Sequence, residues 1–245
     1  MKLTLSRYWG VAAVLLLWQG WVSLTGVNAI VMPQPANVIA DILSSPGVYL
    51  QNGGQTLMLA ALGLIIGMGL GTLIAVIAWT SRVMSGILVP LSLIFSSVPV
   101  VTLIPVLARI FGYDVKTVLA IVVIISFFPA FVFTSAGLKA LPPGSDDLFK
   151  VLGAPPLRRF IHLVAPATVP SWMIALRLAA PPAVLSAMVA EFLMGTSGLG
   201  HMFRTAATDF QTERAFGTSL VATVISVICF TGSTVAERRV NEKWR

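Results

Sequence analysis

The sequence predicts an all-α, polytopic membrane protein with about six transmembrane helices, and its composition leads to that fold class. Of the 245 residues, 57% are hydrophobic and 10% are charged, and the mean hydropathy is +0.92. So few charges cannot cover a water-soluble surface. Several apolar stretches also reach about 20 residues, the length that a helix needs to cross a hydrocarbon core about 30 Å thick. We therefore expect one transmembrane domain over residues 1–245.

The apolar stretches define the expected spans, which we place at about residues 8–25, 55–80, 84–111, 117–138, 171–194 and 217–235. The first span also imitates a secretory signal, because basic residues precede it and a small-residue site follows it at residues 27–29. Trp18 and Trp21 favour a retained helix, since aromatic rings are preferred at the membrane interface. After residues 32–35 (MPQP), Val38 and Ile42 recur at helical spacing and predict a short amphipathic helix at the outer surface.

The distribution of lysine and arginine predicts the orientation. Eleven basic residues fall on one side of the membrane and four on the other, so the positive-inside rule places both termini and the loop at residues 139–170 in the cytoplasm. The inner group is Lys2, Arg7, Arg82, Lys139, Lys150, Arg158, Arg159, Arg238, Arg239, Lys243 and Arg245, and the outer group is Arg109, Lys116, Arg204 and Arg214. Because the basic residues are spread over separate loop ends, the net charge of +7 does not indicate a nucleic-acid partner.

Three glycines in the second span, Gly63, Gly67 and Gly71, are spaced by four. They place three positions without side chains on one helix face, which predicts close packing of another helix. The nearby glycine-rich run is not a phosphate loop, because it lies within an apolar helix and no lysine follows it.

Residues at membrane depth that could line a transport pathway are charges, helix breakers and aromatic rings. Arg177 and Glu191 lie within the fifth span, about 21 Å apart along a straight helix, so each needs a partner elsewhere or water. Proline removes backbone donors, and such breaks are tolerated where a cavity or another helix satisfies the freed carbonyls. The pathway candidates are Ser96, Ser97, Pro99, Phe127, Phe128, Arg177, Pro181, Pro182 and Glu191.

Enzymatic chemistry has little support in this sequence. No histidine and glutamate pair has metal-ligand spacing, and Cys229 is the single cysteine, so we expect no metal site. Ser96 and Ser97 lack a nearby histidine or aspartate that could activate a nucleophile. No GxxxxGK[ST] motif occurs, so any use of ATP must come from another chain.

The loop at residues 139–170 is unusually polar for so apolar a chain. Gly144 and Ser145 precede a short expected helix. Its first turn holds Asp146 and Asp147, where the helix dipole favours anions, and Gly153 can end the helix. Leu148, Val151 and Leu152 give this helix an apolar face, and Arg158 and Arg159 follow it. Such a segment can dock into a groove of a soluble partner.

The same loop resembles the cytoplasmic signature of bacterial ABC-importer permeases, in which an acidic residue and two alanines precede a glycine and a distal leucine-proline. Asp147, Gly153 and Pro166 take the acidic, glycine and proline places. The chain departs from the signature at Asp147, where glutamate is usual, and at Leu148, Phe149 and Ala165. Further fragments follow in the order of the nitrate/sulfonate/taurine branch, namely MPQP at 32–35, Pro99, Pro105, Phe128-Pro129, LRLA at 176–179, AEF at 190–192 and GLG at 198–200.

The resemblance implies a permease subunit that performs no bond chemistry itself. It implies a second permease copy, two separate ATPase subunits that bind ATP and Mg²⁺, and an extracytoplasmic substrate-binding protein, assembled in the bilayer of a bacterial inner membrane. The residues that it places against the ATPase are Asp146, Asp147, Leu148, Phe149, Val151, Leu152, Gly153, Ala154, Arg158, Arg159 and Pro166.

The substrate is open at this stage. Arg109 and Arg177 favour a small anion such as a sulfonate or nitrate, and an uncharged heterocycle such as a pyrimidine precursor is an alternative. Two other classes remain as rivals. An ion-coupled secondary transporter would need an inverted repeat and a carboxylate pair, and a non-transporting scaffold would tolerate any change in the loop.

Overall fold

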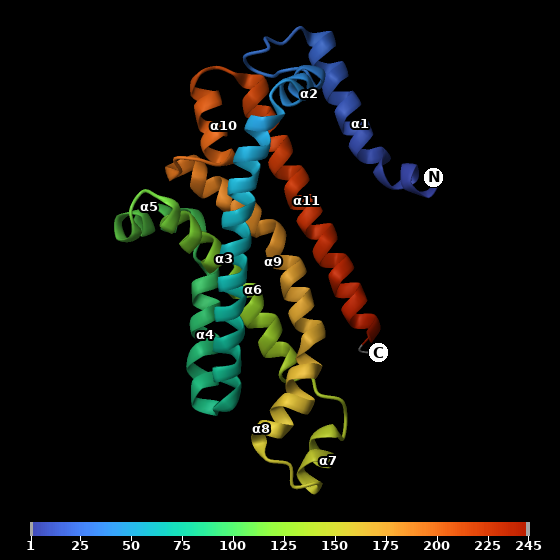
Figure 1. Cartoon of the computed structure of the whole chain (residues 1–245), viewed down its shortest axis with the longest axis vertical. Coiled ribbons are helices and arrows are strands. Elements are labelled where there is room, and N and C mark those ends of the chain that lie inside the picture. Colours follow the sequence, from blue (N-terminus) through green and yellow to red (C-terminus); the bar gives the residue numbers. More distant parts are fainter. Residues whose placement is uncertain (1, 244–245) are drawn as a thin grey trace.

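The computed structural model describes residues 2–243, apart from the side chains of residues 2–8, 11, 12, 93 and 95–97, and every regular element in that part of the chain is helical (Figure 1). In chain order the elements are α1 Lys2–Thr25, α2 Pro35–Ser44, α3 Pro46–Thr80, α4 Arg82–Ser97, α5 Val100–Phe111, α6 Val115–Gly137, α7 Ser145–Val151, α8 Pro156–Arg159, a π-helical turn Phe160–Val164, α9 Ala165–Met194, α10 Leu199–Thr208 and α11 Thr212–Lys243.

Four helical segments of the described chain are long and apolar enough to cross a membrane: α3, α6, the continuous stretch Pro156–Met194 that contains α8 and α9, and α11. Shorter apolar helical stretches lie at Ala13–Thr25, Arg82–Ser92 and Val100–Phe111. The chain is thus an all-α, polytopic membrane protein. Several helices extend past the expected spans: α3 begins at Pro46 and not near residue 55, α9 begins at Ala165 and not near residue 171, and α11 continues to Lys243.

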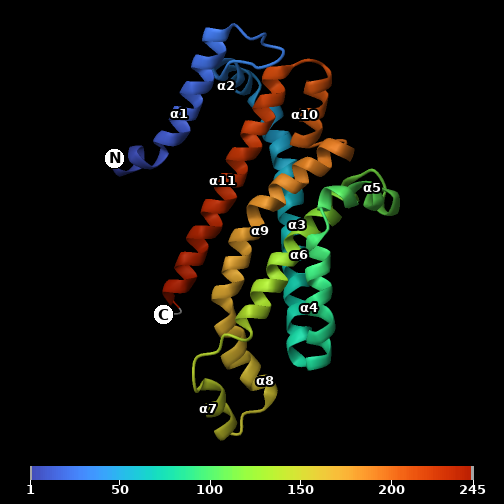
Figure 2. The ribbon, with the colours of Figure 1, turned by 180° about the vertical axis from the view of Figure 1, so that it is seen from behind.

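The expected span at residues 84–111 is two helices in the structure. α4 ends at Ser97 and α5 begins after Pro99, so the helix is interrupted at the pathway candidates Ser97 and Pro99. Proline lacks the backbone donor that a continuous helix needs. α4 runs back beside α3, and α5 turns away from both helices (Figure 1). The double proline behaves differently, since Pro181 and Pro182 lie inside α9, whose ribbon bends in its C-terminal half (Figures 1 and 2).

The core lies where α3, α6 and α9 pack together. An added Cβ on Gly63 would lie 2.5 Å from Val122, and one on Gly71 would lie 2.5 Å from the carbonyl oxygen of Phe127, so the glycine face of α3 touches α6 directly. α9 presents a face of small residues to its neighbours. Its fully or nearly fully buried alanines are Ala175, Ala179, Ala180, Ala183, Ala187 and Ala190. Small side chains on both helices let the backbones approach closely, which is how membrane helices gain packing energy without a hydrophobic driving force.

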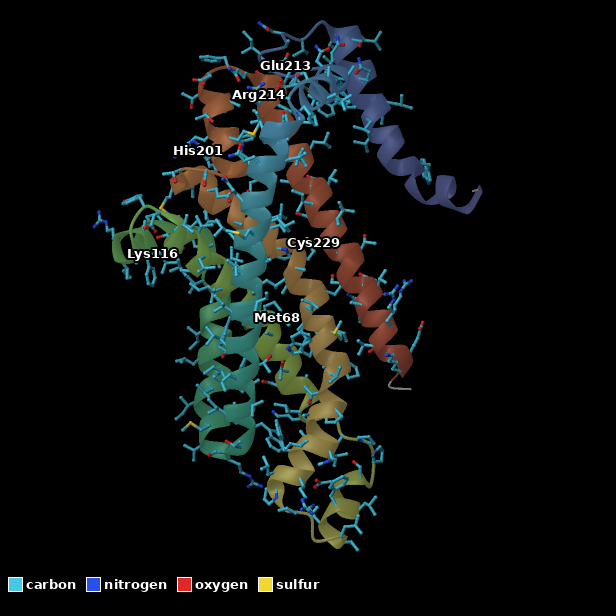
Figure 3. All side chains as sticks on the ribbon, viewed as in Figure 1. Met68, Lys116, His201, Glu213, Arg214 and Cys229 are labelled. Atoms are coloured by element: carbon cyan, nitrogen blue, oxygen red, sulfur yellow. The ribbon has the colours of Figure 1, made fainter. Side chains whose placement is uncertain are left out.

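The two ends of the bundle differ. α1, α2 and α10 lie at one end, and α7 and α8 lie at the other, beyond the ends of α3 and α4 (Figures 1 and 2). At the first end, Asp41 of α2 accepts a hydrogen bond from the Tyr49 hydroxyl at 2.5 Å and forms an ion pair with Arg214 at 3.2 Å. Arg214 lies at the start of α11, on the same end as α1 and α2 (Figure 3). These contacts join α2 to the first turns of two long helices.

Candidate functional site

The short helix α7 forms within the polar loop as its sequence predicts. Gly144 precedes it at φ 74°, Asp146 and Asp147 occupy its first turn, and Gly153 follows it at φ 65°. The backbone N–H groups of Gly153 and Ala154 donate to the carbonyls of Lys150 and Phe149 at 3.0 Å. A left-handed glycine just past the last turn allows this return of the chain, because it carries no Cβ.

The outer face of α7 is apolar and open. Val151 is 85% exposed, Leu152 70% and Leu148 57%, and no residue of α7 is buried. Phe149 and Ala154 are half-buried, and Arg158 is exposed on α8. Three neighbouring aliphatic side chains beyond the membrane-spanning helices form the kind of patch that marks a protein contact.

The charges on this loop form a local network. The Lys150 ammonium lies 2.9 Å from a carboxylate oxygen of Asp146 and 3.4 Å from one of Asp147, and Arg159 forms a close ion pair with Asp146. The Lys150 ammonium, with the Arg159 guanidinium beside it, holds the pKa of the Asp146 carboxyl below its ordinary value. The Asp146 carboxylate in turn raises the pKa of Lys150.

A second candidate region is an apolar groove where α5, α6 and α9 meet. A cavity of about 290 Å³ is lined by residues that include Phe127, Phe128 and Pro182. A neighbouring cavity of about 260 Å³ shares Pro182 and continues along Val101 and Val189. Three of the pathway candidates, Phe127, Phe128 and Pro182, therefore line the same cavity.

The remaining pathway candidates lie elsewhere or at its edge. Pro99 is exposed at the start of α5, and Pro181 is half-buried in α9. Ser96 and Ser97 fall outside the described side chains. Pro166, from the loop signature, is half-buried in the first turn of α9.

Arg177 finds its partner on another helix. Its guanidinium lies 3.0 Å from the carboxylate of Glu237 in α11, with 33% of the arginine side chain and 10% of the glutamate side chain exposed. The need for a partner was predictable from the cost of an unpaired charge at membrane depth. Glu237 was missed, because it lies just past the apolar stretch that defined the last span.

Glu191 lies in a buried junction of α9, α3 and α10 and is 1% exposed. Its Oε2 accepts hydrogen bonds from the Thr56 hydroxyl at 2.7 Å and the Gly200 N–H at 3.1 Å. Two side chains of α3 also accept hydrogen bonds from the start of α10. The same Thr56 hydroxyl oxygen accepts from Leu199 N–H at 2.9 Å, and the Asn52 amide oxygen accepts from Gly198 N–H at 3.2 Å.

The first N–H groups of a helix lack partners within it, so this junction caps α10 from outside. An added Cβ on Gly198 would overlap the Glu191 carboxylate, and Gly198 also has φ 92°. An added Cβ on Gly200 would lie 2.0 Å from the carbonyl oxygen of Met188 in α9. Gly198 therefore makes room for the Glu191 side chain, and Gly200 for the backbone of α9. The sequence analysis named the GLG fragment but did not predict its contact with Glu191. The one sequence signal for this contact is that AEF, which contains Glu191, is followed closely by GLG.

No group of three or more histidine, cysteine, aspartate or glutamate side chains suited to a metal occurs among the residues that the structure describes. Cys229 lies half-buried in α11 (Figure 3).

The helical bundle, its apolar groove and the exposed helix beyond its end define a membrane-embedded permease. The chain belongs to the family of binding-protein-dependent transport system inner membrane components, whose match covers residues 63–245. The family consists of the non-catalytic membrane subunits of ABC transporters. Membership excludes the secondary transporter and the scaffold as classes for this chain.

The chain is 28% identical over 219 residues to the formylaminopyrimidine transport permease protein ThiX of Halalkalibacterium halodurans. The aligned region covers 89% of this chain and 87% of that protein. It is 26% identical over 236 residues to SsuC of Bacillus subtilis, whose name assigns it to aliphatic sulfonates transport, with 96% of this chain and 85% of that protein covered.

Solved structures share the fold. A chain of the MetNI methionine ABC transporter in an inward-facing conformation superposes with a TM-score of 0.69 at 15% identity, covering 80% of this chain and 98% of that one. A chain of an amino acid ABC transporter superposes with a TM-score of 0.69 at 15% identity, covering 82% of this chain and 97% of that one.

Proposed function

We propose that this chain is the membrane-spanning permease subunit of an ATP-driven importer, which moves a small solute into the cytoplasm by alternating access. Two copies would enclose the pathway, each apolar groove contributing one side. Two separate ATPase subunits would bind ATP and Mg²⁺, and an extracytoplasmic binding protein would deliver the solute. The protein would lie in a bacterial inner membrane with both termini in the cytoplasm.

The observation that carries this proposal is the exposed apolar face of α7. Val151 and Leu152 are 85% and 70% exposed on a helix that lies outside the bundle. Docking of this face into a groove of an ATPase would remove the apolar surface from water, at about 25 cal/mol per Å². Asp147, with 82% of its side chain exposed, is free to meet a basic rim of the same groove.

Co-purification from membranes tests the docking directly. We expect an ATPase subunit to be recovered with the wild-type chain and lost with Val151→Glu or Asp147→Lys. Val31→Glu is the matched control, because Val31 is also a well-exposed valine, at 70%, but lies in the loop between α1 and α2 at the opposite end of the bundle. Equal recovery of the ATPase with Val151→Glu, Asp147→Lys and Val31→Glu would show that α7 is not the docking element.

The solute is proposed as a small molecule of one of two classes. A nitrate- or sulfonate-like anion is the first, since a relative is named for aliphatic sulfonates and Arg109 is exposed at the end of α5. Arg177 supports an anion less than its sequence position suggested, because Glu237 neutralises it. An uncharged heterocycle is the second class, favoured by the apolar groove with Phe127 and Phe128, onto which a flat ring can stack.

The cognate binding protein decides between these classes, because in such systems it meets the solute first. Its thermal midpoint should rise with an alkanesulfonate or nitrate if the first class is correct, and with an aminopyrimidine if the second is. Stabilisation by none of these compounds would reject both classes and leave the importer proposal to the co-purification test.

A further inference from the structure

The two adjacent aspartates of α7 have different surroundings, although both lie in its first turn. The Asp147 side chain is 82% exposed, and its one basic neighbour is Lys150 at 3.4 Å. The Asp146 side chain is 32% exposed and lies between Lys150, at 2.9 Å, and Arg159 of α8. The carboxylate of Asp146 therefore points back toward the protein, and that of Asp147 points toward water.

Arg159 extends this contact to a helix distant in sequence. Its guanidinium carbon lies 5.8 Å from the ring centroid of Trp79, within the range of a cation–π interaction. Trp79 is the penultimate residue of α3, and its ring also packs at 5.6 Å against Phe160, the residue after Arg159. Trp79 and Phe160 both border the apolar cluster of Ala78, Phe131 and Val164, which joins α3, α6 and the π-helical turn before α9.

Without this contact α7 has little to hold it. No residue of α7 or α8 is buried, and the backbone hydrogen bonds around α7 stay within the loop from residue 142 to residue 154. The chain itself connects α7 to α6 on one side and to α8 and α9 on the other. α3 has no such connection and is reached only through side chains.

We propose that Asp146, Arg159 and Trp79 form a clamp that fastens α7 to the cytoplasmic end of α3. The clamp gives a movement of α7 a second route into the membrane, to α3 directly, beside the covalent route to α9. Asp146 is a positioning residue in this arrangement, acting through Arg159, and Asp147 is the aspartate left to face the ATPase. The clamp rests on the proposed coupling of α7 to an ATPase for its purpose, but not for its existence.

The geometry favours a clamp over a second docking charge. A carboxylate that already binds one guanidinium and one ammonium has used about half of its acceptor positions, and its two oxygens are held by residues of this chain. Its charge is also neutralised locally, so it attracts a basic rim less than Asp147 does. A guanidinium that bonds a carboxylate at its edge can still lie over a ring with its face, which lets Arg159 bind both partners at once.

The first test measures the clamp in the full chain without any ATPase. Spin labels at Val151→Cys and Thr80→Cys, both exposed positions, report the distance between α7 and the end of α3 in lipid nanodiscs. The background carries Cys229→Ser, because Cys229 is the single native cysteine. Labelled chain is diluted with unlabelled chain so that one pair of labels is read in each particle.

The variants separate a clamp from a general defect. We expect a narrow distance distribution in the wild type, a broader one with a longer-distance population in Asp146→Asn and in Trp79→Leu, and a narrow one in Asp147→Asn. Asp146→Glu should restore the narrow distribution, because it keeps the carboxylate. A narrow distribution in both Asp146→Asn and Trp79→Leu would overturn the clamp.

The second test uses the complex with its ATPase and a fluorophore at Thr80→Cys. Addition of ATP should change the emission in the wild type, and the change should be lost in Asp146→Asn although the ATPase is still recovered, and regained in Asp146→Glu. Loss of the ATPase in Asp146→Asn, to the same degree as in Asp147→Lys, would place Asp146 on the docking surface and overturn the clamp. Failure of the wild-type chain to recover any ATPase would instead reject the proposed function, and the distance measurement would still decide the clamp.

Discussion

The contact between α3 and α6 predicts that a single methyl group on Gly67 destabilises the protein. An added Cβ there would lie 2.6 Å from the carbonyl oxygen of Val123 and 2.7 Å from Cβ of Ser126. The first distance is about 0.8 Å shorter than the 3.4 Å at which ordinary van der Waals contact begins. A backbone oxygen cannot rotate out of the way, so Gly67→Ala must push the two helices apart or strain them.

The cost follows from the loss of packing along the interface. Inserting a methyl group into a well-packed core costs typically about 1–3 kcal/mol, and the neighbouring contacts at Gly63 and Gly71 leave α3 no room to slide. Gly69 is the matched control, because it lies on the same helix two residues away and an added Cβ there meets nothing within 4 Å. Gly69→Ala should leave stability unchanged or raise it slightly, since alanine favours a helix more than glycine does.

Reversible unfolding of the purified protein in mixed micelles, with increasing fractions of sodium dodecyl sulfate, measures both changes. We expect Gly67→Ala to lower the free energy of unfolding by about 1–3 kcal/mol, which corresponds to roughly a fivefold to 150-fold change in the unfolding equilibrium. Equal unfolding curves for Gly67→Ala, Gly69→Ala and the wild type would refute the close approach of α3 and α6.

Three further predictions concern the charged contacts. Glu191→Leu removes the acceptor of the Thr56 hydroxyl and the Gly200 N–H. In the same unfolding assay it should destabilise the protein by about 1–3 kcal/mol for each donor left without a partner. Glu191→Gln should cost less, because its amide oxygen still accepts a hydrogen bond. Arg177→Leu should destabilise more than the double variant with Glu237→Leu, since the single change leaves a 10% exposed carboxylate unpaired; a double variant that is less stable than the single would contradict this. Lys150 and Arg159 hold the pKa of the Asp146 carboxyl low, so the contribution of this ion pair to stability is present above the ordinary pKa of 3.8 and is lost only as the pH falls below it. The distance between the labels at residues 80 and 151 should therefore stay narrowly distributed from pH 7 to pH 5. Broadening within that window would contradict the ion pair.

Much of the fold follows from local rules that act along the chain. α6 covers residues 115–137 where the apolar stretch predicted 117–138, because the length of a hydrophobic run is set by the membrane thickness. α7 begins at Ser145 and gives way to Gly153, as the first-turn aspartates and the glycine predict. The break before α5 likewise lies at a proline, Pro99, which lacks the backbone donor that a continuous helix needs, although Pro181 and Pro182 do not end α9.

The candidate site was predictable only in part. The apolar face of α7 could be read from the spacing of Leu148, Val151 and Leu152, because a helix of known limits has a known periodicity. The different surroundings of Asp146 and Asp147 could not be predicted in this way. They are neighbours of the same type in the same turn, and only the position of Arg159 distinguishes them.

The sequence by itself determined the fold class, the approximate position of the apolar helices and the short helix in the polar loop, since composition, hydrophobic length and capping residues act locally. The tertiary structure decided which side chains meet across distant segments: Arg177 with Glu237, Glu191 with Thr56, and Arg159 with Trp79. Such pairs depend on the rotation and crossing of packed helices, where a turn of one residue, about 100°, moves a side chain to a different neighbour. No local sequence pattern determines the rotation of one helix against another, so only the packed structure shows which partners the buried charges have.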